Sequence, residues 1–338
     1  MKVLIIGGTG QISRSISRQF LEAGIELTLF NRGKTNLPGL GGYRSIIGDR
    51  NDVKEFEIQM ADAGTFDCVI DMVCFLPEQA ESLVRVFGNR IGQLIFCSSA
   101  AVYQRPASRY PIKEAEPLIP TSSYGQNKAR CERVLQSAQE QNLFDLTILR
   151  PANTYGPGGD LIYTLGWGNG FLDRIRKRKA LVSPGDGSAL RAYCHADDVA
   201  RAFVQAAGNS RAYGQMYHIT GEEWLTWDRY FELIARAMDM PLPHLVHIPC
   251  DILFAMAPEQ LPDVIENYRF NNIFDNQAAR QDLGFRYTIP FNEGVSQTIA
   301  WLDENKRIKN SDLDSFDFTI ISAWNARQTG YPLSFSEA

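Results

Sequence analysis

The stretch from Lys2 to Ser13, KVLIIGGTGQIS, constrains the fold of this chain more than any other. Its apolar run 3–6 is typical of a short strand that is buried on both faces of a sheet. Apolar residues then recur every four positions up to Phe20, which predicts a helix that ends at Gly24. Between strand and helix stand Gly7, Gly8 and Gly10. An ordinary glycine turn is one interpretation, but in this context a bare backbone and a helix N-terminus commonly bind a pyrophosphate.

The rest of the first half alternates between short apolar runs and helical patterns. Strands are expected at 25–30, 43–47, 66–73, 93–97 and 145–149, and helices at 52–63, 77–90 and 124–141. This alternation predicts an α/β fold with a Rossmann-type, doubly wound parallel sheet, whose ligand lies outside the carboxyl ends of the strands. A last short strand at 217–220 is expected to return to this sheet, before a helix at 225–238.

The regular alternation gives way to irregular segments after the sixth strand, near Thr154. We therefore expect residues 1–153 to form a dinucleotide-binding domain that 193–220 rejoin. Residues 154–192 and 221–305 would form a smaller, mixed substrate-binding lobe. The polar segment 306–338 is expected to be a C-terminal tail that wraps the surface or a neighbouring molecule.

Composition excludes several classes of function. The 338 residues are 44% apolar, which allows a sizeable core, and the net charge of −5 gives no overall attraction to nucleic acid or anionic membranes. No apolar run approaches the ~18 residues of a membrane span, and we expect no secretory leader before the first strand. The six cysteines show no metal-ligand spacing. We expect a reduced, cytoplasmic protein without a structural metal.

The end of the second predicted strand bears on the choice of cofactor. An acidic residue at this corner binds the 2′-hydroxyl of the adenosine ribose, whereas an arginine accommodates a 2′-phosphate. The chain has Asn31, Arg32 and Lys34 here and no acid. This favours NADP within an NAD(P) site, although cations in a surface turn are also often only solvated. After the third strand, Asp49 either lies near the adenine or caps the next helix.

Hydroxyl and amine groups follow the fifth strand. Ser98 and Ser99 come directly after it, and Tyr124 and Lys128 stand four residues apart in the helix beyond. Residues at that spacing share one helical face. A tyrosine and a lysine meet at this spacing by accident in many chains, but here they accompany a serine at a strand end and a dinucleotide turn.

Five blocks in order resemble the extended short-chain dehydrogenase/reductases, the superfamily of nucleotide-sugar epimerases, dehydratases and reductases. They are Gly7–Ile12, Ser98–Tyr103, Tyr124–Lys128, Arg150–Pro157 and Gly185–Val199. The resemblance implies that Tyr124 is the catalytic acid/base, that Lys128 binds the nicotinamide ribose and favours the ionised phenol, and that Ser99 bonds the reacting oxygen. A free phenol titrates near ~10, so it needs such help to act as a base near neutral pH.

The resemblance also implies the residues that bind cofactor and substrate. Asn153 and Arg191 fall where relatives hold the phosphates of a sugar nucleotide. The implied cofactor-binding residues are Gly7, Thr9, Gly10, Gln11, Ile12, Asn31, Arg32, Asp49, Arg50, Met72, Val73, Lys128 and Pro151.

Some positions depart from the family pattern. Ser13 replaces the third glycine of the loop and is small enough for close packing of helix and strand. Ala100 and Ala101 occupy the places where dehydrating and decarboxylating relatives carry acids, which counts against both reactions. Ala192 replaces the usual aspartate beside Arg191. His195 is expected to be structural, before a helix cap at Asp197 or Asp198.

The set of Ser99, Tyr124 and Lys128 without extra acids favours an NAD(P)-dependent epimerase of a nucleotide-activated sugar. Such an enzyme oxidises a hydroxyl to a ketone and returns the hydride to the opposite face. A net NADPH-dependent reductase or dehydrogenase that uses the same residues is the first alternative. The expected partner is a small-molecule nucleotide sugar, without a membrane, and a homodimer is expected only because the family commonly forms one.

Two segments, 29–33 and 165–186, also resemble the chloroplast stem-loop-binding proteins, which are RNA-binding relatives of the same fold. Those proteins usually lack the tyrosine–lysine pair that this chain has. The basic run Arg174–Lys179 is a solvated helical face, an attractor of an anionic substrate, or the one local support for RNA binding. The net charge argues against nucleic acid as a partner.

Overall fold

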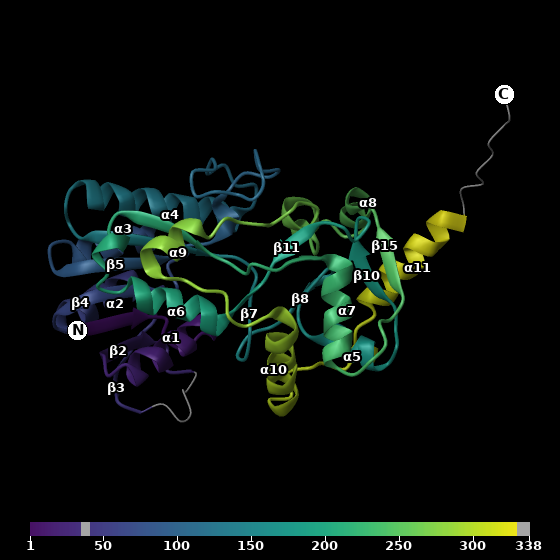
Figure 1. The fold of residues 1–338 in the computed structure, drawn as a ribbon, viewed down its shortest axis with the longest axis horizontal. Helices are drawn as coiled ribbons and strands as arrows, with labels where there is room; N and C mark the ends of the chain where they lie inside the picture. Colours follow the sequence, from purple (N-terminus) through teal and green to yellow (C-terminus); the bar gives the residue numbers. More distant parts are fainter. Residues whose placement is uncertain (35–40, 330–338) are drawn as a thin grey trace. The chain divides into compact units, whose positions relative to one another are not determined.

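The computed structural model describes residues 1–34 and 41–329. By its contacts the chain forms two compact units (Figure 1). Unit 1 comprises residues 1–159, 192–224 and 272–294, and unit 2 comprises 160–191, 225–271 and 295 onward. Three elements run across these boundaries: β11 (Leu190–Ala192), β14 (Trp224–Thr226) and α10 (Phe291–Glu304).

Unit 1 is built on a seven-stranded sheet in the order β13-β6-β5-β4-β1-β2-β3, and every neighbouring pair is parallel. The strands are β1 (Lys2–Ile6), β2 (Glu26–Asn31), β3 (Tyr43–Ile47), β4 (Phe66–Asp71), β5 (Ile91–Cys97), β6 (Asp145–Pro151) and β13 (Gln215–Ile219). The predicted doubly wound parallel sheet is therefore confirmed. The order reverses between β1 and β4, and ligands of such sheets bind at the carboxyl ends beside that point.

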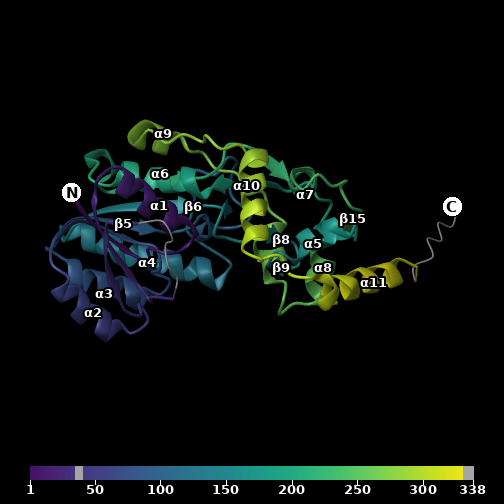
Figure 2. The same cartoon turned by 90° about the horizontal axis from the view of Figure 1, so that it is seen from below.

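Helices cover both faces of this sheet (Figure 2). On one face lie α1 (Gln11–Glu22), α6 (Ala196–Ala206) and α9 (Gln277–Leu283), and on the other α2 (Val53–Asp62), α3 (Pro77–Phe87) and α4 (Ser123–Glu140). The central strand β1 sends Val3 and Ile5 into the first core and Leu4 and Ile6 into the second. Both faces of β1 are buried, which explains its uninterrupted apolar sequence.

The remaining elements of unit 1 are short. A 3₁₀ turn at Ala100–Val102 follows β5, and another, at Ser210–Ala212, precedes β13. Strands β7 (Thr154–Tyr155) and β12 (Cys194–His195) pair in parallel. The helix α9 packs on α6 through Ala279 and Leu283, so residues 272–294 group with unit 1, whereas the sequence suggested a lobe of 221–305.

Unit 2 is smaller and mixed. Its helices are α5 (Gly170–Arg176), α7 (Trp227–Ala237), α8 (Cys250–Met256) and α11 (Phe316–Thr329), with single turns at Val264–Tyr268 and Ser311–Leu313. Strands β8 (Ile162–Tyr163) and β9 (Gly166–Trp167) are antiparallel, and β10 (Leu181–Pro184) and β15 (Leu245–Ile248) are parallel. The rings of Tyr163 and Phe171 stack at 5.0 Å, and Phe231 packs against both edge-on. None of the helices in residues 1–34 and 41–329 is long and apolar enough to cross a membrane.

Two helix caps differ from the sequence-based predictions. Asp52, rather than Asp49, caps α2: its carboxylate accepts the N–H of Glu55 at 3.1 Å, while Asp49 accepts the N–H of Asn51 in the preceding turn. His195 itself caps α6, since its Nδ1 accepts the N–H of Asp197 at 3.2 Å. Asp197 and Asp198, which the sequence suggested as caps of α6, therefore do not cap it, and their carboxylates form other bonds.

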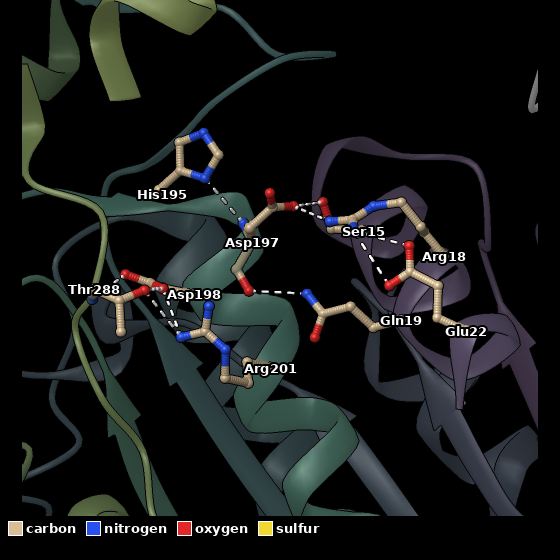
Figure 3. A network of polar contacts seen from close by, with 9 residues as sticks. All are labelled: Ser15, Arg18, Gln19, Glu22, His195, Asp197, Asp198, Arg201 and Thr288. Atoms are coloured by element: carbon tan, nitrogen blue, oxygen red, sulfur yellow. Dashed lines mark hydrogen bonds and ion pairs between the residues drawn. The ribbon is translucent and has the colours of Figure 1, made fainter. Parts of the chain in front are cut away.

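Asp197 binds α1, the helix that follows the glycine loop, through its carboxylate and its backbone carbonyl (Figure 3). Its carboxylate accepts hydrogen bonds from Ser15 at 2.5 Å and Arg18 at 2.8 Å, and its carbonyl accepts one from Gln19, all three on α1. Burial alone would raise the pKa of Asp197, but the Ser15 hydroxyl and the Arg18 charge outweigh it and hold that pKa below its ordinary value. The contact between α1 and α6 is therefore charge-assisted as well as apolar.

We expect Asp197→Asn to destabilise the protein by about 1 kcal/mol at neutral pH, because the variant loses charge-assisted hydrogen bonds. A lowered carboxyl pKa contributes stability above the unfolded value, and this is lost as the pH falls through the folded value. The gap between wild type and variant should therefore close below about pH 4. Urea unfolding at pH 7, 5 and 3.5 measures it. Glu22→Gln, at the exposed partner of Arg18, is the control and should change little; a gap for Asp197→Asn that is independent of pH would contradict the interpretation.

Candidate active site

The glycine loop lies at the carboxyl end of β1, where the strand order reverses. Gly7 has a φ of +83°, and a Cβ added to it would lie 2.5 Å from Cγ1 of Val73, just after β4. Only glycine fits both the conformation and the space at this position. Gly10 precedes α1 directly, and the N–H groups of the first turn of a helix have no acceptor within the helix. The loop thus brings bare backbone and free N–H groups together.

Serine side chains hold this loop closed. The Ser13 hydroxyl donates to the carbonyl of Gly7 at 2.6 Å and accepts the N–H of Gly10 at 2.8 Å. One turn further on, the hydroxyl of Ser17 donates to the carbonyl of Gly8 at 3.2 Å. The departure from a third glycine is therefore more than a tolerated small residue, because Ser13 bonds both ends of the turn.

Two hollows adjoin at the loop. The first has a volume of about 350 Å³ and the second about 390 Å³, and Gly7, Gly10, Val73 and Phe75 line both. Of the predicted cofactor-binding residues, the first hollow is lined by Gly7, Thr9, Gly10, Asn31, Arg32, Asp49, Arg50 and Val73. The second is lined by Gly7, Gly10, Gln11, Ile12, Met72, Val73, Lys128 and Pro151. The structure brings these residues together around the two hollows, and their roles in binding a cofactor remain predictions.

The second hollow also holds the three predicted catalytic residues, Ser99, Tyr124 and Lys128. The ring of Tyr124 is 44% exposed, at the start of α4, and Ser99 is partly buried just after β5. Lys128 is only 1% exposed. The Ser99 hydroxyl, the Tyr124 phenol and the Lys128 ammonium thus differ in exposure but line one hollow. They can bond to the same small molecule.

Two strand ends orient Lys128. Its ammonium donates to the carbonyl of Cys74 at 2.9 Å and to that of Cys97 at 2.8 Å. The rings of Phe75 and Phe96 flank it, with their centres 4.7 and 4.9 Å from Nζ. An ammonium has three N–H bonds, and these carbonyls take two of them. The third can serve a ligand in the hollow.

The two adjacent serines have different surroundings. The hydroxyl of Ser98 is buried and donates to the carboxylate of Glu132 at 2.5 Å. The hydroxyl of Ser99 accepts the N–H of Ala101 at 3.1 Å, which caps the 3₁₀ turn Ala100–Val102. Ser98 is therefore committed to the interior, whereas Ser99 keeps its own proton to donate into the hollow.

A buried ion pair behind the hollow was missed by the sequence analysis. Glu132, on α4, and Arg150, on β6, are both inaccessible to solvent and share two hydrogen bonds, of 2.5 and 2.9 Å. Arg150 also donates to the hydroxyl of Tyr103 at 2.6 Å, which in turn donates to Nε2 of His218. Nδ1 of His218 lies 3.0 Å from the carbonyl of Asp275.

This chain of bonds has one consistent set of protons. A carbonyl oxygen can only accept, so Nδ1 of His218 carries the proton and Nε2 accepts from Tyr103. Burial lowers the pKa of His218 to about 3, which keeps the ring neutral. Burial likewise raises the pKa of Tyr103, so its hydroxyl stays protonated. The signal in the sequence was the spacing of Tyr124, Lys128 and Glu132, four residues apart on one helical face.

Three predicted residues have side chains engaged inside the protein. Arg50 is 5% exposed; its Nη2 donates to the carbonyl of Gln79, and its Nε lies 3.5 Å from Asp71. The amide of Asn153 donates to the carbonyl of Ala192 at 2.9 Å. Arg191 belongs to unit 2 and is fully buried.

Arg191 was predicted to hold a substrate phosphate. Its guanidinium lies 5.0 Å from the ring of Trp227 and 5.1 Å from that of Tyr268. Its role in holding a phosphate remains a prediction, and the proposal below rests on the residues of the second hollow.

The basic run Arg174–Lys179, which begins in α5 and continues past its end, is largely neutralised by acids. Lys177 and Lys179 both pair with Asp312, and Arg176 pairs with Asp303. Arg174 is buried and lies 3.0 Å from Asp317. These acids all come from the segment after residue 300, so the run anchors the C-terminal part of unit 2 and presents no broad cationic surface for nucleic acid.

The parallel sheet, its glycine loop and the switch point together define a dinucleotide-binding fold of the doubly wound type. The model of the NAD dependent epimerase/dehydratase family matches residues 3–220, and the chain belongs to that family. This confirms the resemblance to the extended short-chain dehydrogenase/reductases.

The individual relatives share only a minority of their residues with this chain. The chloroplast stem-loop binding protein of 41 kDa b of Arabidopsis thaliana is 31% identical over 261 residues, which are 73% of this chain and 65% of that protein. The UDP-glucose 4-epimerase of Mycolicibacterium smegmatis is 31% identical over 207 residues, 60% of each chain. This chain thus spans less than two thirds of the length of either. The crystal structure of UDP-glucose 4-epimerase from Bifidobacterium longum in complex with NAD+ and UDP shares the fold: the TM-score is 0.73 over 91% of this chain and 99% of that one, at 19% identity.

We expect Glu132→Ala to destabilise the protein by about 3–5 kcal/mol, because it leaves the buried guanidinium of Arg150 without its counter-charge. The double variant Glu132→Leu, Arg150→Met removes both charges and should regain most of that loss. Urea unfolding of the two variants measures this. The exposed pair Glu57–Arg85 provides the control, since Glu57→Ala should cost less than about 1 kcal/mol. Equal losses at the two glutamates would contradict the interpretation.

Proposed function

We propose that this protein is an NAD(P)-dependent epimerase of a nucleotide-activated sugar. One observation carries the proposal: Ser99, Tyr124 and Lys128 line the same hollow as the glycine loop. The family assignment supports the coarser statement, a nucleotide-sugar epimerase or dehydratase. Of these, epimerisation is favoured because the strand-end positions that would carry acids hold Ala100 and Ala101, so no side chain there can deliver a proton to a leaving hydroxyl.

The residues around the two hollows fit a dinucleotide. The glycine loop offers backbone without side chains, and the N-terminus of the twelve-residue helix α1 favours an anion such as a pyrophosphate. Nη1 of Arg50 is a buried donor that lacks a hydrogen-bond partner among the described residues, beside the first hollow. Gly7, Gly10, Arg32 and Lys128 would hold the cofactor. When bound, the nicotinamide supplies a hydride acceptor and donor.

The side chains of the protein would handle the proton. Tyr124 would take the proton of a sugar hydroxyl as the ketone forms and give it back afterwards. Lys128, whose direction is fixed by two carbonyls, favours the ionised phenol because opposite charge stabilises it. Its third N–H would bond a ribose hydroxyl. Ser99 would donate to the reacting oxygen, and this arrangement is available because Ser98, not Ser99, is committed to Glu132.

Stem-loop binding is the function in the name of one relative, and it suggests RNA binding as a second candidate function. The pairing of the basic run Arg174–Lys179 with Asp303, Asp312 and Asp317 weighs against carrying that function over. An overall charge of −5 points the same way, because contacts to phosphates need a basic face.

We expect Tyr124→Phe to lower turnover by roughly 10²–10⁴-fold, because it removes the proton-transferring hydroxyl and keeps the ring. Cofactor affinity should stay within about twofold of wild type. The assay follows nucleotide sugars, beginning with UDP-glucose, by proton NMR, and cofactor binding by calorimetry. Tyr110→Phe is the matched control, since Tyr110 is 37% exposed and lies outside both hollows.

Two results would argue against this proposal. Unimpaired turnover in Tyr124→Phe would refute the role of the phenol. Stoichiometric consumption of added NADPH, in step with product, would show a net reductase instead, since an epimerase regenerates its cofactor in every cycle.

We expect NADPH to bind more tightly than NADH, because Arg32 lines the first hollow at the end of β2 and residues 31–34 include no acid. Arg32→Asp should reverse the preference, with a loss of NADPH affinity of roughly tenfold, about 1.4 kcal/mol. Calorimetric titration with each cofactor measures this. Lys54→Asp, an equal change of charge on α2 outside both hollows, should leave the ratio unchanged. A wild-type preference for NADH would overturn the assignment.

A further inference from the structure

Phe75 has an unusual position for a large apolar side chain. It is 44% exposed, directly beyond β4, and lines both hollows at the place where they meet. Its backbone is held in place, since the side chain of Gln79 accepts its N–H at 2.7 Å and that of Leu76 at 3.1 Å. The exposed ring is therefore displayed by a fixed backbone.

The same ring forms part of a cage around the Lys128 ammonium. The centres of the Phe75, Phe96 and Tyr124 rings lie 4.7, 4.9 and 6.0 Å from Nζ. Phe96 is fully buried, so the rings with a solvent face are those of Phe75 and Tyr124. Their centres are 6.4 Å apart. Lys128 is 1% exposed because these rings and the two carbonyls surround it.

Excluding water from a cation changes how strongly it acts on its neighbours. The interaction between charges grows as the effective dielectric constant falls, so a dry ammonium stabilises a nearby anion more than a hydrated one does. An aromatic face offsets part of the cost of removing water from that ammonium. Phe75 meets both conditions at Lys128.

We propose that Phe75 is a positioning residue that keeps water from Lys128, so that the ammonium acts at full strength on the Tyr124 phenol and on a cofactor in the hollows. This inference rests on the proposed function and deepens it. Phe75 also forms part of the wall where the two hollows meet. Both halves of a bound dinucleotide would therefore contact it.

Other charged and titratable groups face Lys128 from each element packed around it. From β4 comes Asp71, whose pKa is raised by burial and which has Arg50 as its partner. The thiols of Cys74, Cys97 and Cys131 complete the set; burial raises the pKa of Cys97 to about 11, and a hydrogen bond with Cys74 lowers that of Cys131. Replacing Phe75 leaves all of these groups in place, and the readout on the phenol without cofactor separates the effect of water from the contact of Phe75 with a dinucleotide.

The test compares Phe75→Ala with Phe75→Leu. Phe75→Ala admits water, so we expect the acid limb of the pH–rate profile to move up by about one unit, which means a roughly tenfold loss near pH 7 that disappears at high pH. Phe75→Leu keeps the apolar bulk and should restore most of the wild-type profile. Leu76→Ala is the control, since Leu76 is 45% exposed next to it and lines neither hollow.

A second readout needs neither substrate nor cofactor. The ultraviolet difference between each protein and its Tyr124→Phe counterpart reports the ionisation of that one phenol. Its pH midpoint should be higher by about one unit in Phe75→Ala than in wild type. An equal loss of turnover at every pH, or an unchanged phenol midpoint, would overturn the inference. Full activity of Tyr124→Phe would instead refute the proposed function, so the two failures are distinguishable.

Discussion

The burial of the Lys128 ammonium is the constraint on which the candidate site depends. A cation that is removed from water is costly unless oxygen atoms replace its hydration shell. Here the replacements are the carbonyl of Cys74, in the turn after β4, and that of Cys97, at the end of β5. One side chain of α4 therefore fixes two strand ends, and these ends carry Phe75 on one side and Ser99 on the other. The Lys128 ammonium therefore stabilises the fold as well as lining the candidate site.

The helix α4 repeats this arrangement one turn further along. Tyr124, Lys128 and Glu132 follow one another at intervals of four, so one face of the helix passes from an exposed phenol to a buried ammonium and a buried carboxylate. The carboxylate pairs with Arg150 of β6 and accepts the hydroxyl of Ser98. Polar groups thus occupy the face of α4 where apolar residues would ordinarily pack. They hold three neighbouring elements at fixed positions by directional bonds.

The fold could be predicted from the sequence because its signals are local. The apolar run of β1, the glycines and the four-residue spacing in α1 each act over a few residues, and the structure confirms the parallel sheet that they indicate. The ends of elements were less accessible, because side chains decide them. The fourth strand stops at Asp71, two residues before its predicted end, since its carboxylate accepts the N–H of Val73 at 2.8 Å. His195 caps α6 through a ring nitrogen, and no sequence pattern predicts that role.

The site was predictable only where a motif fixes the spacing. Tyr124 and Lys128 could be paired from the sequence, but the partners of Lys128 are backbone carbonyls, and these leave no trace in the residue types. Arg150 and Glu132 come together across eighteen residues, and Phe75 reads in the sequence as an ordinary apolar residue after a strand.

Arg191 illustrates what a motif leaves out. Its motif position predicts a phosphate ligand, a role that remains a prediction, and gives no sign of the neighbouring rings of Trp227 and Tyr268, which are distant in sequence. Residue type and spacing indicate which groups are present, but burial decides which of them can meet a ligand. Of the predicted catalytic residues, Tyr124 and Ser99 have exposed surface in the second hollow, whereas Lys128 is 1% exposed.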